Sequence, residues 1–169
     1  MKLVVVSDNH RDQAVLTWIV SEYPGADHYL HVGDSEMSEE QLTSLGFYGV
    51  RGNYPFEPKF PNDLLMEFAG VKTFITHGHK YGVKLGIYGL VEAAISLNVH
   101  LVLYGHTHQP KINEFENILF VNPGSASSSR SVYSSFAIIT IEQERILIEI
   151  IECYTKKVLS EYSRFLDLR

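Results

Sequence analysis

The sequence predicts an α/β fold in which two mixed β-sheets pack face to face, with helices on the outside. The first half alternates short β-rich apolar runs with helical patterns, which is typical of β-α-β units. The last third is rich in strands joined by turns, which indicates antiparallel hairpins. The 169 residues are 45% apolar without a break in composition, so we expect one domain spanning residues 1–169.

The amino-terminal part is expected to hold three strands and two helices. Strands are predicted at residues 3–6, 29–32 and 47–50, because each is a run of β-branched, aliphatic or aromatic residues. Apolar residues recur at helical spacing between the first two strands, and this helix should end near Tyr23. A second helix is predicted for residues 36–45, where apolar residues lie among acidic ones and Gly46 follows.

The rest of the chain is predicted to be mainly strands. Residues 64–68 and 71–75 should form a hairpin around Ala69-Gly70, and a helix around residues 90–95 should lead to a strand at 100–104. Further strands are expected at residues 111–115, 118–121, 135–141 and 145–151. Residues 156–165 fit either a helix or a final strand. The Ser-rich stretch 125–131 is expected to be a flexible loop with a solvated Arg130.

Charge and cysteine content narrow the class of protein. A net charge of −6 argues against binding nucleic acid through a broad basic surface, so we expect a small-molecule substrate. No apolar run approaches the roughly 20 residues of a membrane span, and no signal peptide is visible. The lone Cys153 excludes an internal disulfide, which agrees with a cytoplasmic location. Assembly into a homo-oligomer is left open.

Polar residues able to bind a metal follow five of the predicted strands, usually beside a glycine. They are Asp8 and His10, Asp34, Asn53, His77 and His79, and His106 and His108. Open α/β sheets place their sites at the carboxyl ends of strands, so we expect these residues to converge on one crevice. Repetition of one context five times favours a site over five unrelated polar strand ends.

Carboxylates, an amide and imidazoles without thiolates favour Mn²⁺, Fe, Zn²⁺, Co²⁺ or Ni²⁺. Seven ligands, which these eight residues can supply, are too many for one catalytic ion that keeps an open position, and they suit two ions that share a bridging ligand. Asp34 is the natural bridge. Two ions about 3.5–4 Å apart can hold a hydroxide nucleophile and stabilise charge on phosphorus. We therefore expect metal-assisted hydrolysis of a phosphate ester.

Five ordered blocks resemble the calcineurin-like metallophosphoesterases. They are Asp8-x-His10, Gly33-Asp34, Gly52-Asn53, His77-Gly78-His79 and Gly105-His106-x-His108. The size of the chain and the turn at residues 122–125 resemble the small bacterial and archaeal phosphodiesterases of that superfamily. The resemblance implies a four-layer α-β-β-α sandwich and two divalent transition-metal ions, with Mn²⁺ as the first expectation.

The resemblance also implies roles for single residues. Asp8, His10, Asp34 and His108 would hold one metal, and Asp34, Asn53, His77 and His106 would hold the other. The catalytic assignments are Asp34, Asn53 and His79. Histidines outside the blocks, which are His28, His31 and His100, are expected to have packing or surface roles.

One position departs from the commoner family pattern. Many relatives follow the Gly-Asn pair with a histidine that contacts the phosphate and assists the leaving group, whereas this chain has Tyr54. The general acid is therefore open: His79 is either a substitute or a hydrogen-bond partner of the ligands. A second functional class is a non-catalytic scaffold, because the same fold resembles a retromer subunit that binds partners and lacks a competent metal site.

Overall fold

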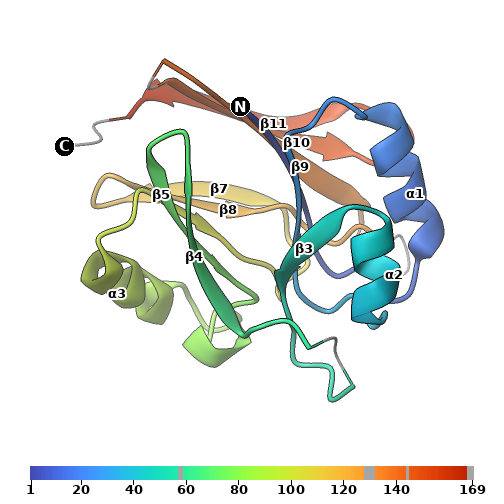
Figure 1. Ribbon diagram of the computed structural model, residues 1–169. Coiled ribbons are helices and arrows are strands. Elements are labelled where there is room, and N and C mark those ends of the chain that lie inside the picture. The colour runs from blue at the N-terminus through green and yellow to red at the C-terminus, as the bar shows by residue number, and fades with distance from the viewer. Residues whose placement is uncertain (57–58, 128–131, 144, 167–169) are drawn as a thin grey trace.

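The computed structural model describes residues 1–56, 59–127, 132–143 and 145–166. Its strands are β1 (Lys2–Val6), β2 (His28–Val32), β3 (Phe47–Val50), β4 (Asp63–Phe68), β5 (Val71–Thr76), β6 (Leu101–Leu103), β7 (Lys111–Phe115), β8 (Ile118–Asn122), β9 (Ser135–Glu142), β10 (Arg145–Glu152) and β11 (Val158–Phe165). Its helices are α1 (Gln13–Glu22), α2 (Glu39–Ser44), α3 (Tyr88–Leu97) and the short 3₁₀ turn η1 (His79–Tyr81). Figure 1 shows α1 and α2 on one side of the two sheets and α3 on the other.

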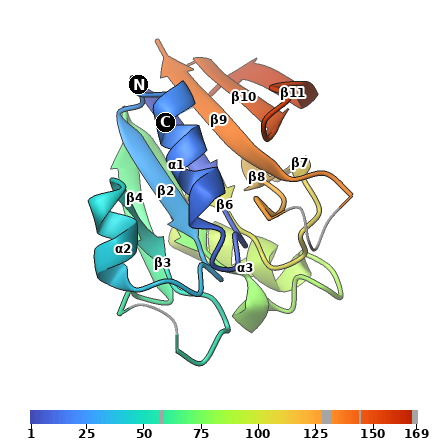
Figure 2. The ribbon, with the colours of Figure 1, turned by 90° about the vertical axis from the view of Figure 1, so that its right-hand side faces the viewer.

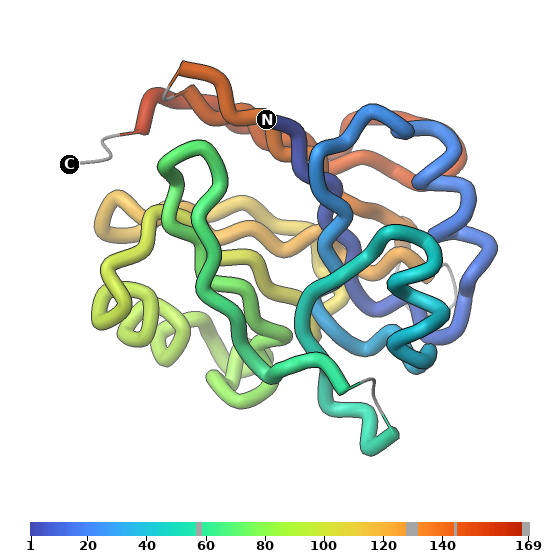
Figure 3. The backbone as a smooth tube through the Cα atoms, viewed as in Figure 1, coloured from blue at the N-terminus to red at the C-terminus, as the bar shows by residue number. Residues whose placement is uncertain are grey.

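The strands form two mixed sheets. The first has six strands in the order β11-β10-β9-β1-β2-β3, with β1, β2 and β3 parallel and the others antiparallel. The second has five strands in the order β4-β5-β6-β8-β7, with β5, β6 and β8 parallel. The tube in Figure 3 shows the first strand beside strands from the end of the chain. Parallel neighbours bring their carboxyl ends to the same edge of each sheet.

Three apolar layers confirm the predicted four-layer sandwich. Alternation along β1 places Leu3 and Val5 in the core between the sheets, and Val4 and Val6 in the layer beneath α1 and α2. Figure 2 shows α1 lying along the outer face of the first sheet. In the second sheet, Val102 packs in a third layer that includes residues of α3. Each sheet therefore buries apolar side chains on both of its faces.

The predicted helix over residues 36–45 is too long at its start. It begins at Glu39, because the Ser38 side chain caps it and Gln41 completes a reciprocal capping box. Glu36 has a φ of 54° and lies outside the helix. The sequence left helix and strand open for residues 156–165, and Val158–Phe165 form β11, which pairs with β10 from Arg145 to Ile151.

The start of the Ser-rich stretch is buried. Ser125, Ala126 and Ser127 are buried, and Ser125 Oγ donates a hydrogen bond to the Asp8 carbonyl at 2.8 Å. The rest of the predicted loop, with Arg130, lies outside the described residues. Within the described ranges, no helix has both the length and the apolar character needed to cross a membrane.

Candidate metal centre

Two neighbouring loops at the carboxyl edge of the first sheet are joined through their backbones. Asp8 N donates to the Gly33 carbonyl at 3.0 Å, and His10 N donates to the Asp34 carbonyl at 3.3 Å. Asp8, His10 and Asp34 have φ values of 54°, 44° and 52°, in the left-handed region that non-glycine residues rarely adopt. Such backbone strain is concentrated at functional sites, where the surrounding structure holds it in place.

The first group of potential ligands consists of Asp8, His10 and His108. One ligand atom from each lies within 4.8 Å of the others. Asp8 Oδ1 is 3.1 Å from His108 Nε2 and 4.0 Å from His10 Nε2, and Asp8 is fully buried. These are three of the four residues predicted to hold one metal.

The second group consists of Asp34, His77 and His106. Their ligand atoms also lie within 4.8 Å of one another, and His77 Nε2 is 3.5 Å from Asp34 Oδ2. His77 Nε2 is only 3.9 Å from Asp8 Oδ1, so the two groups are adjacent. Each group contains three of the four residues of one predicted ligand set. That Asp34 bridges both metals stays a prediction.

Buried atoms without hydrogen-bond partners test whether these residues suit metal ions. Among the described residues, six buried side-chain nitrogen or oxygen atoms make no hydrogen bond, and three of them are Asp8 Oδ1, His10 Nε2 and His77 Nε2. Leaving a buried polar atom unsatisfied costs about 1–3 kcal/mol, so such atoms are rare in proteins. All three belong to the two ligand groups and point to a missing positive partner. The oxygen and nitrogen donor set fits divalent transition metals.

Hydrogen bonds fix which nitrogen of two histidines faces the centre. His77 Nδ1 lies 2.8 Å from the Val32 carbonyl and His10 Nδ1 lies 2.8 Å from Glu36 Oε1, so in both rings Nδ1 donates and Nε2 is left for a metal. Sequence reasoning missed Glu36, which it placed in a helix. An acidic residue near a helix start is ordinary, so no local signal marked it.

The carboxylates are oriented in the same way. Asp8 Oδ2 accepts hydrogen bonds from Ser7 Oγ and from the His106 backbone N, which leaves Oδ1 for a metal. Asp34 Oδ1 accepts from the backbone N of Asn53 at 2.9 Å and of Tyr54 at 3.1 Å. This places Asn53 beside Asp34. The part of Asn53 as a metal ligand through its side chain stays a prediction.

Two glycines allow these close approaches. A Cβ atom at Gly52 would lie 2.0 Å from Asp34 Oδ1, and a Cβ atom at Gly105 would lie 2.0 Å from Ser7 Oγ. Both distances are far inside van der Waals contact, so only glycine fits at either position without moving the carboxylates. Steric contacts therefore explain why glycine occupies these two positions beside the predicted ligands.

Charges around the centre shift several pKa values. Burial raises the pKa of Asp34, but neighbouring His77, the Tyr54 backbone N–H and His10 outweigh it and lower that pKa. Burial lowers the pKa of His77, but Asp34 and Asp8 outweigh it and raise that pKa. Burial, helped by the positive charges of His77 and Lys84, lowers the pKa of His106 to about 4. At neutral pH the centre therefore presents anionic carboxylates and a neutral His106.

Metal affinity is expected to weaken as pH falls through about 6.5 and below, because histidine must lose its proton to bind a metal. The raised pKa of His77 makes protons compete already above the usual imidazole range, whereas His106 should begin to compete only near pH 4. Calorimetric titration with Mn²⁺ from about pH 8 down to about pH 5 measures this. Unchanged affinity over that range would contradict the histidine ligands, and His28→Gln, remote from the ligands, serves as control.

The other histidines behave as expected for packing residues. His31 is fully buried, and its Nε2 lies 2.9 Å from Asn9 Oδ1, so it supports the loop that carries Asp8. His28 Nδ1 lies 2.9 Å from the Tyr48 hydroxyl. His100 Nδ1 accepts a hydrogen bond from a backbone N at 3.0 Å. None of the three belongs to a ligand group among the described residues.

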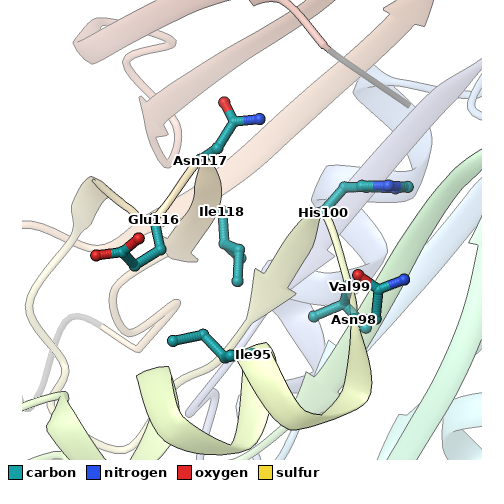
Figure 4. A pocket seen from close by; sticks show the side chains of 7 residues that line it. All are labelled: Ile95, Asn98, Val99, His100, Glu116, Asn117 and Ile118. Atoms are coloured by element: carbon teal, nitrogen blue, oxygen red, sulfur yellow. The ribbon is translucent and has the colours of Figure 1, made fainter. Parts of the chain in front are cut away.

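Two pockets differ in their relation to the centre. Figure 4 shows one of about 300 Å³, lined by residues 98–100 before β6 and by the turn between β7 and β8. It lies at the amino end of β6, whereas the ligands follow the carboxyl end. A second pocket of about 610 Å³ is lined in part by Thr107, which stands between His106 and His108, and by Lys84. Of these two pockets, the second includes a residue of the segment that carries His106 and His108 in its lining.

Fold and site together define a metal-dependent phosphoesterase. The chain belongs to the calcineurin-like phosphoesterase superfamily, whose domain model matches residues 1–144. It is 29% identical over 146 residues to the probable metallophosphoesterase YsnB of Bacillus subtilis, covering 85% of this chain and 86% of that protein. It is 31% identical over 80 residues to the phosphodiesterase MJ0936 of Methanocaldococcus jannaschii, covering 47% of this chain and 44% of that protein.

Solved structures share the same architecture. A predicted phosphoesterase from Streptococcus pneumoniae superposes with a TM-score of 0.83 at 29% identity, covering 96% of this chain and 97% of that one. A Vps29 variant from Entamoeba histolytica superposes with a TM-score of 0.79 at 18% identity, covering 99% of this chain and 100% of that one. The second likeness concerns the fold alone.

Proposed function

We propose that this protein is a dinuclear metal-dependent phosphodiesterase acting on a small-molecule phosphate ester. The observation that carries the proposal is the pair of adjacent ligand groups with orphaned buried atoms, Asp8 Oδ1 and His10 Nε2 in one group and His77 Nε2 in the other. When bound, two divalent ions would lower the pKa of a water molecule towards about 7 and stabilise charge on the phosphate. Mn²⁺ is the first candidate, with Fe, Zn²⁺, Ni²⁺ and Co²⁺ as alternatives.

The residues of the chain prepare the site before substrate binds. Asp8 and Asp34 supply the negative charge that two cations need, and their lowered pKa values keep both ionised at neutral pH. Val32 and Glu36 hold the histidine rings in fixed orientations. Preorganised groups of this kind need no rearrangement during reaction, which is a main source of catalytic power.

His79 has two proposed roles, a proton donor to the leaving group or a hydrogen-bond partner. Its ring centroid lies 5.5 Å from that of His77 and 6.0 Å from that of His106, and its buried Nδ1 makes no hydrogen bond. Burial and the positive charges of His77 and Lys80 lower the pKa of His79. A lowered pKa leaves little protonated imidazole at neutral pH, which argues against the proton-donor role.

The second pocket offers room for the organic group of a diester. It begins at Thr107, within the His-Thr-His segment of the site, and is also lined by the exposed side chains of Leu85 and Tyr88. A lining that mixes apolar, aromatic and lysine side chains suits an organic group attached to a phosphate. The side chains that line the pocket do not select one particular base, sugar or lipid.

The proposal is tested by loading the purified protein with each candidate metal and measuring metal content and hydrolysis together. We expect two metal equivalents per chain and faster turnover of bis(4-nitrophenyl) phosphate than of 4-nitrophenyl phosphate. A panel of cyclic dinucleotide, nucleotide and phospholipid-derived diesters then identifies the substrate. A protein with both metals in place that hydrolyses none of these esters would refute the proposed function.

The alternative is a non-catalytic scaffold on the same fold. The likeness to Vps29 at 18% identity bears on the fold only. A scaffold that binds partners through its surfaces has no need of buried, unpaired ligand atoms, which cost stability. The retained ligand groups therefore favour the enzyme, and stoichiometric metal binding without turnover is the result that would favour the scaffold.

A further inference from the structure

Arg11 and Tyr54 form a polar pair beside the metal centre that none of the roles above uses. Arg11 Nη2 donates a hydrogen bond to Tyr54 Oη at 2.6 Å, and the Arg11 guanidinium carbon lies 5.6 Å from the centroid of the Tyr54 ring. The two residues come from the loops that follow β1 and β3. Their side chains therefore connect two of the loops that carry ligands.

The pair is anchored to one member of each ligand group. Tyr54 N donates to Asp34 Oδ1 at 3.1 Å, in the second group. Arg11 Nε lies 3.4 Å from Glu36 Oε2, and the other oxygen of Glu36 holds His10 of the first group. These contacts tie Arg11 and Tyr54 to the loops that carry one ligand of each group.

The hydrogen bonds within the pair leave other donor groups of Arg11 and Tyr54 free to bind a ligand. Arginine has donors only, so Tyr54 Oη must accept from Arg11, and the phenolic hydrogen remains available to donate. Among the described residues, Arg11 makes its polar contacts through Nε and Nη2, which leaves the Nη1 donors without an acceptor. The Arg11 side chain is 64% exposed, so these donors are accessible to a ligand from solvent.

We propose that Arg11 and Tyr54 bind the non-bridging oxygens of the phosphate ester and orient it over the metal centre. The proposal rests on the proposed phosphodiesterase function and adds two positioning residues to it. A guanidinium group matches the geometry of phosphate oxygens and carries a fixed positive charge. That charge matters here because Asp8, Asp34 and Glu36 surround the centre and the chain has a net charge of −6.

Phosphate titrations separate this role from a structural one. Calorimetry measures the binding of inorganic phosphate to Mn²⁺-loaded wild type, Arg11→Met, Tyr54→Phe and the control Arg145→Met, an exposed arginine on β10. Loss of charge-assisted hydrogen bonds should weaken phosphate binding about tenfold or more in Arg11→Met and by less in Tyr54→Phe. The KM for an aryl diester should rise by a similar factor in Arg11→Met, with a smaller change in kcat. The control should match wild type.

Metal content is measured on the same samples, because Arg11 also contacts Glu36, which orients His10. If Arg11→Met binds phosphate like wild type once both metals are present, Arg11 acts only through Glu36 and the inference is wrong. In that case, turnover of the ester by the wild type still supports the proposed phosphodiesterase function. If metal-loaded wild type turns over no ester, the proposed function fails, and the phosphate titration still decides the role of Arg11. If Tyr54→Phe and wild type bind phosphate with equal affinity, the Tyr54 hydroxyl does not bind the phosphate.

Discussion

Asp34→Ala is expected to abolish hydrolysis and to lower metal content more than any other single ligand change. Asp34 is the carboxylate predicted to touch both ions, and its Oδ2 lies 3.5 Å from His77 Nε2 in the second group. Its lowered pKa shows that the surroundings favour the anion. Losing several kcal/mol of charge stabilisation corresponds to a fall in rate of about a thousandfold or more.

Elemental analysis and diesterase assays on the same preparation measure both effects. Asp34→Asn keeps the shape of the side chain and is the companion variant if Asp34→Ala does not fold. Both should bind fewer than two metals per chain. An active Asp34→Ala protein with two full metal equivalents would disprove the two-metal assignment. His28→Gln, whose imidazole lies outside both ligand groups, should retain metal and activity.

Aryl diesters are expected to turn over far faster than alkyl diesters, because the site lacks a strong proton donor for a basic leaving group. A phenol is a much weaker acid than an imidazolium ion, so a tyrosine at position 54 assists alkoxide departure poorly. Measuring kcat/KM across diesters of graded leaving-group pKa should give a steep dependence. A flat dependence would show that another acid, with His79 the first candidate, already serves.

Tyr54→His should narrow the gap between aryl and alkyl substrates. The backbone at this position lies at the centre, since Tyr54 N donates to Asp34 Oδ1, so an imidazole there starts within reach. A positioned acid contributes about 10²–10⁴-fold, so even partial placement is measurable on alkyl diesters. Tyr54→Phe is the matched control, because it removes the hydroxyl without supplying an acid. An equal leaving-group dependence in both variants would contradict the prediction.

Local patterns were enough to predict most of the fold. Strands such as β1, β3, β8 and β9 have strong apolar or β-branched runs, so their positions follow from side-chain chemistry with little help from the rest of the chain. The helix predicted for residues 36–45 begins too early, because the acidic and apolar residues before Ser38 also fit a helical pattern. Only the capping geometry shows that the helix starts after Ser38. Residues 158–165 were ambiguous because a strand at a sheet edge owes its form to pairing with β10.

The sequence by itself predicted the ligand types, because parallel strands bring their carboxyl ends to the same edge of each sheet and the residues at those ends are chemically distinctive. Their division into two metal sets came from the resemblance to the family. Only the tertiary structure decided what orients them. Glu36 reaches His10 across 26 positions in the chain, and Arg11 reaches Tyr54 across 43. Glu36 and Arg11 are ordinary polar residues in loops, and no local pattern predicts their partners, whereas Tyr54 was marked only by its place after Gly52-Asn53. Their roles arise from distances between loops, which are set when the two sheets pack and not by any local pattern.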